Sequence, residues 1–433
     1  MLTKTEQLIS KYKDIASDLE IITGINERQD LLLTVDLVYH SVLRFEFQGR
    51  MVLKGYLEAL ILGDTRTGKT ATVKGLMDFY KLGEMGTGES STFAGLVGGL
   101  SQVNKRWNIQ WGKIPLNDRR LFVLDEASGL SIDEISMMSG IRSTGIAEII
   151  KIQMEKTRAR TRLIWISNAR RGQPMQTYTY GVLSVRELIG RPEDISRFDI
   201  VITSASGDVE SDVYNKAVKR QQKIKIKQRL YRDLILWAWS RTPSDVIIGA
   251  KATQAILDYA STQGKKYNSG IPIVEPAEQR IKLAKMAVAV ACRFFSCSED
   301  GERVMVYPEH AEFAYHFLEK CYSKSSMRYD EWAKKQNEML VLRDVEEVKK
   351  IIPRKTVDMF MDSEVLNLGD VEDMVGDRLN AKDILKVLRH QRALIKVNSS
   401  LYKKTPAFIT FLRDVMSGKI TLPVSDFGDE EVF

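Results

Sequence analysis

One short segment constrains the fold of this chain more than any other. Residues 63–70 read G-D-T-R-T-G-K-T, after the apolar run 56–62 and before a helix-like stretch over residues 70–80. A strand, a glycine-rich loop and a helix in this order are what the pattern G-x-x-x-x-G-K-[ST] requires. Glycines let backbone N–H groups turn toward a polyphosphate at a helix N-terminus, which itself favours anions. The segment therefore predicts an α/β fold that binds ATP or GTP.

The predicted nucleotide-binding residues are those of the whole loop: Gly63, Asp64, Thr65, Arg66, Thr67, Gly68, Lys69 and Thr70. Lys69 can reach the outer phosphates, and Thr70 offers a hydroxyl to Mg²⁺. We therefore expect ATP and Mg²⁺ as cofactors.

The composition of the chain argues against several other classes of protein. With 433 residues, 44 % of them hydrophobic, the chain can hold two or three domains. Apolar runs such as residues 284–292 are too short to span a membrane, and the N-terminus lacks the basic and apolar order of a signal peptide. We expect a cytoplasmic protein without membrane association. The cysteines, Cys292, Cys297 and Cys321, form no C-x-x-C pair, which argues against disulfides and zinc. A net charge of +7 suits an anionic partner such as nucleic acid.

The order of apolar segments predicts the domains. Between residue 51 and about residue 204, strand-like runs (56–62, 121–124, 163–167 and 200–203) alternate with helical ones, the pattern of a parallel sheet covered by helices. The predicted domains are a helical lead-in (1–50), an α/β core (51–225), a helical lid (226–325), a polar linker (326–344), a winged helix (345–414) and an acidic tail (415–433).

Two predicted strands end in polar side chains. Residues 120–126 read R-L-F-V-L-D-E, a buried strand with Asp125 and Glu126 at its carboxyl end, where ligands bind in α/β sheets. We expect Asp125 to hold Mg²⁺ through water and Glu126 to orient and deprotonate the attacking water. Asn168 follows the run 163–167 and can hydrogen-bond the γ-phosphate or this water.

Arg197 lies in D-I-S-R-F-D, residues 194–199, directly before the last predicted strand. At this edge it is suited to reach the nucleotide of an adjoining subunit, and such an arginine finger contributes about 10³–10⁵ in rate. The alternative is a local ion pair with Asp194 or Asp199.

Five motifs in this order resemble the AAA+ core of the minichromosome maintenance (MCM) helicases. They are the glycine-rich loop, T-G-E-S-S-T-F-A-G-L from Thr87, L-F-V-L-D-E-A, I-S-N and S-R-F-D. Three further segments are similar to the lid helices of that family: L-W-A-W (236–239), I-P-I (271–273) and I-K-L-A-K (281–285). The resemblance therefore covers about residues 24–325. It implies an AAA+ P-loop NTPase core and a homo-oligomeric ring, as a hexamer. It also implies ATP-driven movement along single-stranded DNA, the activity of a replicative-type helicase, here of a phage or mobile element.

The resemblance also implies DNA-binding residues. Residues 101–115 and 148–162 lie where MCM proteins carry two β-hairpins, the second of which grips DNA in the ring channel. The predicted DNA-binding residues are Lys105, Arg106, Trp107, Lys151 and Lys156. The cations would neutralise phosphates, and bases could stack on Trp107 for about 1–3 kcal/mol each. Alternatively, the lysines lie on a solvated strand face, and Trp107 and Trp111 pack beneath the hairpin.

The sequence departs from the family in two places. The family's lid arginine falls at or beside Glu275 and Pro276, and Arg280 is the nearest substitute, which we predict to act at the neighbouring site. MCM proteins carry a large N-terminal domain, whereas about fifty residues precede this core, so how the chain loads onto DNA stays open.

The C-terminal predictions leave alternatives. Within the winged helix we expect helices over residues 345–352, near residue 371 and over residues 381–389, followed by a β-hairpin. The third helix is basic and could meet DNA phosphates or a protein. The tail resembles those of single-strand binding proteins and some phage replication proteins, so Phe433 could recruit a replication protein, or the tail could be a solubilising end.

Two other functions are compatible with the sequence, a helicase loader and a protein remodeller that uses ATP without unwinding DNA. A remodeller should present apolar loop tips, whereas the predicted hairpins are basic.

Overall fold

The structure is a computed structural model that describes residues 3–103, 106–150, 154–209, 227–339 and 341–423. The chain divides into two compact units, residues 1–332 and 333–433. Within the described ranges, no helix is both long and apolar enough to cross a membrane.

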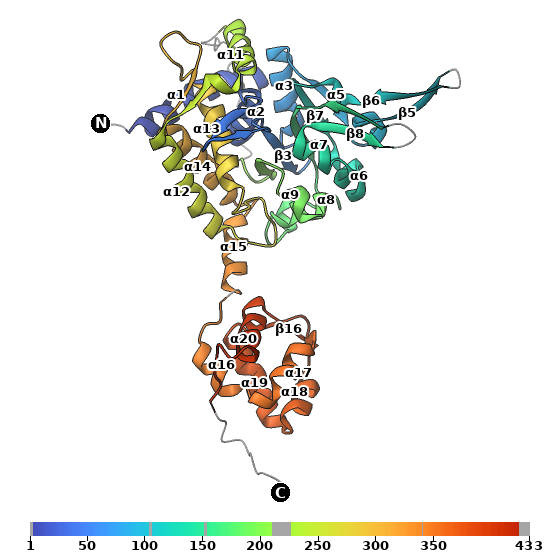
Figure 1. Cartoon of the computed structure of the whole chain (residues 1–433), viewed down its shortest axis with the longest axis vertical. Coiled ribbons are helices and arrows are strands. Elements are labelled where there is room, and N and C mark those ends of the chain that lie inside the picture. Colours follow the sequence, from blue (N-terminus) through green and yellow to red (C-terminus); the bar gives the residue numbers. More distant parts are fainter. Residues whose placement is uncertain (1–2, 104–105, 151–153, 210–226, 340, 424–433) are drawn as a thin grey trace. The chain divides into compact units, whose positions relative to one another are not determined.

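A five-stranded parallel sheet forms the centre of the first unit, flanked by helices (Figure 1), which confirms the predicted α/β class. Its strand order is β11 (Ile200–Ser204), β3 (Glu58–Gly63), β10 (Arg162–Ser167), β7 (Leu121–Asp125) and β4 (Glu84–Thr87). Every residue of β3, β10 and β11 is buried, as their continuous apolar runs predict. The edge strand β4 is not among the predicted strands. The order places β10 between β3 and β7, so the ends of these three strands are neighbours.

The two N-terminal helices belong to this core. Helix α1 (Lys4–Thr23) begins at a capping box formed by Thr3 and Glu6, and it ends at Gly24 with a φ of 70°. Helix α2 (Gln29–Tyr39) is buried at every residue from Leu31 to Tyr39, because it packs against β3, β10 and β11 and also against the helices α1, α3 (Lys69–Tyr80) and α13 (Gln279–Arg293). The helices expected before residue 50 are therefore present, and both contact other elements of the first unit.

Short elements connect the strands of the core. They are β1 (Phe45–Phe47), β2 (Arg50–Val52), α3 (Lys69–Tyr80), α4 (Phe93–Leu96), β5 (Gly98–Val103), β6 (Arg106–Trp111), α5 (Lys113–Leu116), α6 (Ile132–Met137), α7 (Ser139–Thr144), β8 (Ile146–Ile150), β9 (Met154–Arg158), α8 (Leu183–Ile189) and α9 (Pro192–Ile195). β5–β6 and β8–β9 are antiparallel hairpins.

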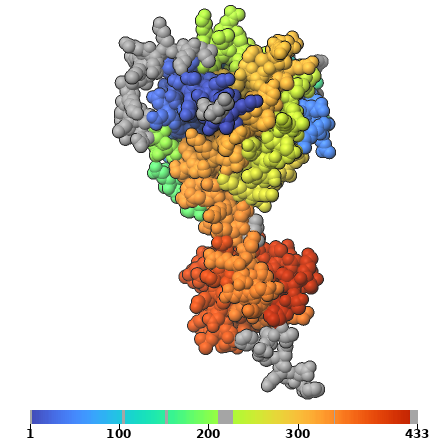
Figure 2. Space-filling model, turned by 90° about the vertical axis from the view of Figure 1, so that its left-hand side faces the viewer, coloured from blue at the N-terminus to red at the C-terminus, as the bar shows by residue number. Residues whose placement is uncertain are grey.

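A helical segment follows the core. It comprises α11 (Gln228–Ser240), α12 (Ala250–Lys266), α13 (Gln279–Arg293) and α14 (Pro308–Tyr322), with a parallel pair of short strands, β12 (Val246–Ile248) and β13 (Val304–Val306). Helix α1 lies beside α14, where the Thr5 hydroxyl donates to Glu312 at 2.5 Å; in Figure 2 the blue N-terminal residues lie against the yellow and orange segment. This segment is joined to the core by Lys285, whose Nζ is 2.6 Å from Asp199 Oδ1.

The predicted linker contains helix α15 (Tyr329–Glu338). Tyr329 is buried, stacks on Tyr267 with ring centroids 4.8 Å apart, and donates to the Ile271 carbonyl at 2.8 Å. Part of the expected linker is therefore packed into the first unit.

The second unit has its own hydrophobic core. Its elements are α16 (Val345–Ile351), α17 (Val357–Asp362), β14 (Val365–Leu366), α18 (Leu368–Val375), α19 (Arg378–His390), β15 (Leu394–Lys396), β16 (Tyr402–Lys404) and α20 (Pro406–Met416). The strands form a sheet in the order β14-β16-β15. The helices near 345, 371 and 381–389 and the final hairpin were predicted, whereas α17, β14 and α20 were not. The acidic tail from residue 424 onward, including Phe433, lies outside the described residues.

Candidate nucleotide-binding site

The loop between β3 and α3 curls tightly before the helix begins. Arg66 (φ 61°) and Gly68 (φ 83°) adopt left-handed conformations, and α3 starts at Lys69. A Cβ added at Gly63 would lie 1.9 Å from the Ser204 carbonyl oxygen, because β3 and β11 pair at this point. Left-handed residues in such a loop direct backbone N–H groups into one concavity, which suits an anion.

Lys69 lies at the centre of this site. Its Nζ donates to the carbonyl oxygens of Gly63, at 3.0 Å, and of Asp64, and to Asn168 Oδ1 at 3.1 Å. Burial lowers the pKa of Lys69 to about 8, although Glu126, Asp64 and Asp125 act in the opposite direction. The ammonium group is therefore held at the mouth of the loop, where an outer phosphate would need it.

The carboxylates lie at the end of β7. Asp125 Oδ1 accepts hydrogen bonds from the Thr70 hydroxyl at 3.2 Å and from the Glu126 N–H at 3.0 Å. A hydroxyl beside a carboxylate fits Mg²⁺, which is usually bound through one or two carboxylates plus substrate phosphates and waters. Among the residues that the structure describes, no group of three or more His, Cys, Asp and Glu side chains could hold a metal ion.

Glu126 is held in an unusual conformation. Its φ of 50° is left-handed, a conformation that costs a non-glycine residue about 1–3 kcal/mol and occurs at functional sites. Burial and the neighbouring carboxylates Asp125 and Glu89 raise the pKa of Glu126, against the effect of Lys69. A raised pKa makes this carboxylate a better proton acceptor.

Asn168 joins the loop to the carboxylates. Because β10 lies between β3 and β7, the residue after β10 faces both. Its Oδ1 accepts from Lys69, and its Nδ2 donates to Glu126 Oε2 at 3.4 Å. A cavity of about 200 Å³ is lined by residues 65–71, by Glu126 and by residues 166–168. The structure therefore brings most of the predicted residues together around one space.

Asp64 turns away from this cavity. Its carboxylate accepts from the backbone N–H groups of Met175, at 2.7 Å, and Ser206, at 3.0 Å. It thereby ties the loop to the segments after β10 and β11, which is a structural role.

Arg197 and Arg280 do not line the cavity. Arg197 Nε is 3.6 Å from Asp194 Oδ1, and a quarter of its side chain (25 %) is exposed. The local ion pair weighed above is thus present, although neither atom makes a hydrogen bond within the described residues. Asp199, the other candidate, pairs with Lys285 instead. Arg280 is exposed on the first turn of α13, where it donates to the Ala277 carbonyl at 2.5 Å.

The hairpin β5–β6 carries the first group of predicted DNA-binding residues. Trp107 lies opposite Gln102 and is 40 % exposed, so it is not packed beneath the hairpin. Lys105 and the side chain of Arg106 lie outside what the structure describes.

The hairpin β8–β9 projects beside β5–β6 from one edge of the unit (Figure 1). Lys156 lies opposite Glu148, and its Nζ is 2.9 Å from Glu148 Oε1, so its charge is already paired. Lys151 falls outside the described residues. Of the residues that the structure describes, the two that flank this turn are exposed and apolar, Ile150 at 67 % and Met154 at 59 %.

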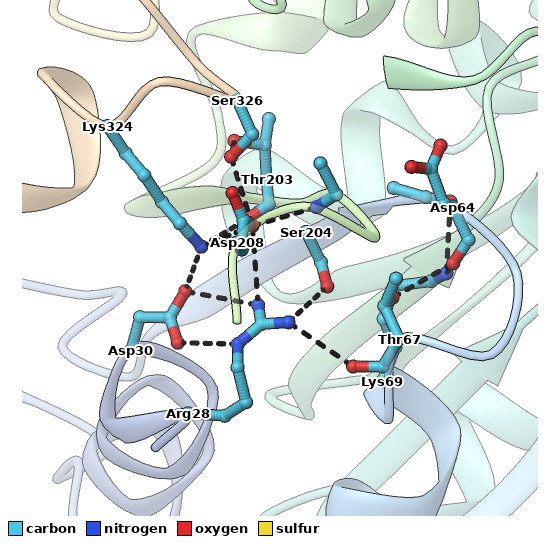
Figure 3. A network of polar contacts seen from close by, with 12 residues as sticks. Arg28, Asp30, Asp64, Thr67, Lys69, Thr203, Ser204, Asp208, Lys324 and Ser326 are labelled. Atoms are coloured by element: carbon cyan, nitrogen blue, oxygen red, sulfur yellow. Dashed lines mark hydrogen bonds and ion pairs between the residues drawn. The ribbon is translucent and has the colours of Figure 1, made fainter. Parts of the chain in front are cut away.

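Arg28, in the turn before α2, is a residue beside the site that no motif predicts. It is buried and donates from Nη1 to the Thr67 carbonyl at 3.3 Å and to Ser204 Oγ at 2.8 Å (Figure 3). Arg28 stands in no motif. Its one sequence signal is an arginine placed directly before an apolar helix.

In the second unit, α19 presents exposed cations at helical spacing, Lys382, Lys386 and Arg389. Arg389 lies 5.7 Å from the ring of Tyr402, which pairs with Lys396 in the hairpin. Asp383 is the single carboxylate of α19. One basic surface thus joins helix and hairpin.

No protein-family model matches this sequence, and the curated proteins contain no significant match. The geometry of the site therefore carries the functional proposal.

Proposed function

We propose that this chain is an AAA+ ATP hydrolase, similar to MCM helicases, that forms a hexameric ring and couples hydrolysis to movement along single-stranded DNA. One observation carries the ATPase part: Lys69, Asn168 and Glu126 are linked by hydrogen bonds around a cavity at the ends of three adjacent parallel strands. Ligands bind at this edge in α/β folds.

The residues divide the chemistry of hydrolysis among them. The loop N–H groups and Lys69 bind the phosphates, and Thr70 with Asp125 would hold Mg²⁺. An ion held there would supply positive charge that offsets the charge of the phosphates. Glu126 accepts the proton of the attacking water, and Asn168 orients that water or the γ-phosphate. Both side chains are held in place, Glu126 by its backbone and Asn168 by hydrogen bonds.

Arg197 is proposed to complete the site of a neighbouring copy. It can leave its ion pair at little cost, because the contact with Asp194 lacks a hydrogen bond and part of the side chain is exposed. Asp194 would keep a second cation close by, since the buried Arg142 has its Nη1 3.8 Å away. We propose Arg280, exposed on α13, as a further cation at the interface.

The two projecting hairpins are proposed to contact single-stranded DNA, with Trp107 as a surface for base stacking. The basic face of the second unit, which we take to be a winged helix, is proposed as an auxiliary phosphate contact. Each phosphate neutralised makes binding more salt-dependent.

Strand displacement on a forked DNA tests the helicase proposal. The native chain should separate the DNA strands when ATP is present, whereas the Lys69→Ala variant should neither hydrolyse ATP nor unwind DNA. Lys151→Ala should keep hydrolysis and lose unwinding, with Lys156→Ala as the matched control because Glu148 already neutralises that cation. A native chain that hydrolyses ATP but never separates strands would refute the helicase proposal.

Mixing two inactive variants tests the ring. A Glu126→Gln copy still supplies Arg197 to its neighbour, and an Arg197→Ala copy still has its own Glu126. The mixture should therefore recover part of the ATPase rate. If Arg197→Ala is fully active alone, the shared site is wrong.

The second candidate is a protein remodeller. It is favoured by the exposed apolar pair Ile150 and Met154 beside the turn of β8–β9, since apolar tips suit protein targets. Replacing both by serine should leave DNA unwinding largely intact in a helicase. Loss of all ATP-dependent function without loss of DNA binding would favour the remodeller.

A further inference from the structure

A cluster of charges, in which Arg28 and Asp208 are buried and Asp30 and Lys324 partly exposed, connects the phosphate-binding loop to the end of the helical segment α11–α14 (Figure 3). On the loop side, the Arg28 side chain is 2 % exposed. Besides its bonds to Thr67 and Ser204, it donates from Nε and Nη2 to the two oxygens of Asp30, at 3.1 and 3.2 Å. Arg28 therefore uses all three of its nitrogens.

On the other side of the cluster, Lys324 follows α14 and is 22 % exposed. Its Nζ lies 2.7 Å from Asp30 Oδ2, 2.6 Å from Asp208 Oδ2 and 3.2 Å from the Thr203 carbonyl oxygen. Asp208 Oδ2 is also 3.9 Å from Arg28 Nη2. Each carboxylate is thus shared by the same two cations, and the four charges balance.

The contact with Thr67 bears on the nucleotide directly. A peptide group is planar and trans, so its C=O and its N–H point in opposite directions. Arg28 binds the oxygen of the peptide between Thr67 and Gly68 and so fixes the direction of the Gly68 N–H. Gly68 lines the nucleotide cavity. A rotation of this peptide would turn that N–H away from the phosphates.

The position of Arg28 depends in turn on its carboxylate partners. Although burial acts to raise it, Lys324 and Arg28 together hold the pKa of Asp30 below its ordinary value. If Lys324 moves away, Asp30 and Asp208 lose one of their two cations. Their attraction for the remaining cation, Arg28, is then no longer balanced. Displacement of the end of α14 is thereby transmitted to the loop.

We propose that Arg28 is a positioning residue for the phosphate-binding loop and that Lys324, through Asp30 and Asp208, couples the loop to the helical segment. This inference rests on the proposed ATP site. Because coupling between two sites is reciprocal, ATP binding should also restrain the chain around Lys324.

Two variants of the full chain test the coupling through affinity for a fluorescent ATP analogue. Arg28→Lys keeps the charge but cannot span Thr67, Ser204 and Asp30 together, and Lys324→Met removes the cation at the far end. Each should weaken binding by roughly tenfold and raise KM for ATP more than it lowers kcat. The double variant should be no weaker than the more severe single variant, because both act through one cluster. Lys324→Arg should restore most of the affinity.

Lys320→Met is the matched control, since Lys320 is an exposed lysine one turn earlier on α14. It should bind ATP like the native chain. Hydrogen exchange at residues 324–328 should slow with ATP in the native chain and not in Arg28→Lys, a change that a purely structural role would not produce.

The outcomes separate the two proposals. If the native chain binds ATP and both variants bind it equally well, with only their melting temperatures lowered, the coupling is refuted and the ATP site stands. If the native chain binds no ATP, the proposed function fails and this inference fails with it.

Discussion

His40 makes the first unit sensitive to acid. It caps α2 and is fully buried, and its Nδ1 lies 2.7 Å from the Asp36 carbonyl oxygen. A carbonyl can only accept, so Nδ1 carries the hydrogen. Nε2 is then unprotonated and has no hydrogen-bond partner among the described residues. Protonation would leave the new Nε2–H without an acceptor among the described residues and add a positive charge near the buried Arg293, although the Asp36 carboxylate, with Oδ1 3.4 Å from Nδ1, acts in the opposite direction.

The size of the effect follows from the pKa. Burial lowers the pKa of His40 from 6.5 to about 4. Between these values the unfolded chain binds a proton that the folded chain does not, so the free energy of unfolding decreases as the pH falls. From pH 7 to pH 5 the loss amounts to about 2 kcal/mol. His310, whose pKa burial also lowers to about 4, acts in the same direction.

The variant His40→Asn separates these contributions, because its amide can donate to Asp36 and does not titrate. Its free energy of unfolding at pH 7 should be lower by roughly 1–2 kcal/mol, since a smaller side chain leaves a cavity. Between pH 7 and pH 5 it should lose about 2 kcal/mol less than the native chain. Urea unfolding followed by tryptophan fluorescence measures this in the first unit alone, because every tryptophan lies before residue 333. Equal pH dependence in the two proteins would refute the buried, uncharged His40.

Two further predictions concern close packing and a buried ion pair. Gly63→Ala should abolish ATP binding and destabilise the first unit, because the new Cβ would lie 1.9 Å from the Ser204 carbonyl oxygen. Gly140→Ala, with nothing within 4 Å of its Cβ, should bind ATP normally, and calorimetry distinguishes the two. Arg142→Met should lower the free energy of unfolding by about 3 kcal/mol, because the buried Glu58 carboxylate would lose the 2.6 Å hydrogen bond from Arg142 Nε and keep the one from Lys54. The double variant with Glu58→Gln should lose less free energy of unfolding, measured with urea, than the two single variants together. Strictly additive losses would contradict an interaction between Arg142 and Glu58.

The local sequence pattern was enough to predict the strands that are buried on both faces. The runs that became β3, β7, β10 and β11 are continuously apolar and bounded by polar residues, so their position did not depend on distant parts of the chain. β4, E-M-G-T, is half-buried and lacks that signal. It becomes a strand because β7 offers it a hydrogen-bonding edge. Likewise, α2 buries Thr34 and Asp36 together with its apolar residues, and only the sheet and the helices α1, α3 and α13 that surround it explain why it is buried.

The sequence by itself determined the chemistry available at the site, because the loop from Gly63 to Thr70, the acidic pair and Asn168 each follow a strand whose end is set by local pattern. Tertiary structure alone decided which of them meet. The strand order puts Asn168 between Lys69 and Glu126, and it turns Asp64 away from the cavity. The Arg28 cluster likewise draws on residues that lie up to 296 positions apart in the chain, since long-range ion pairs leave no periodicity in a sequence and arise only when the folded backbone brings opposite charges together.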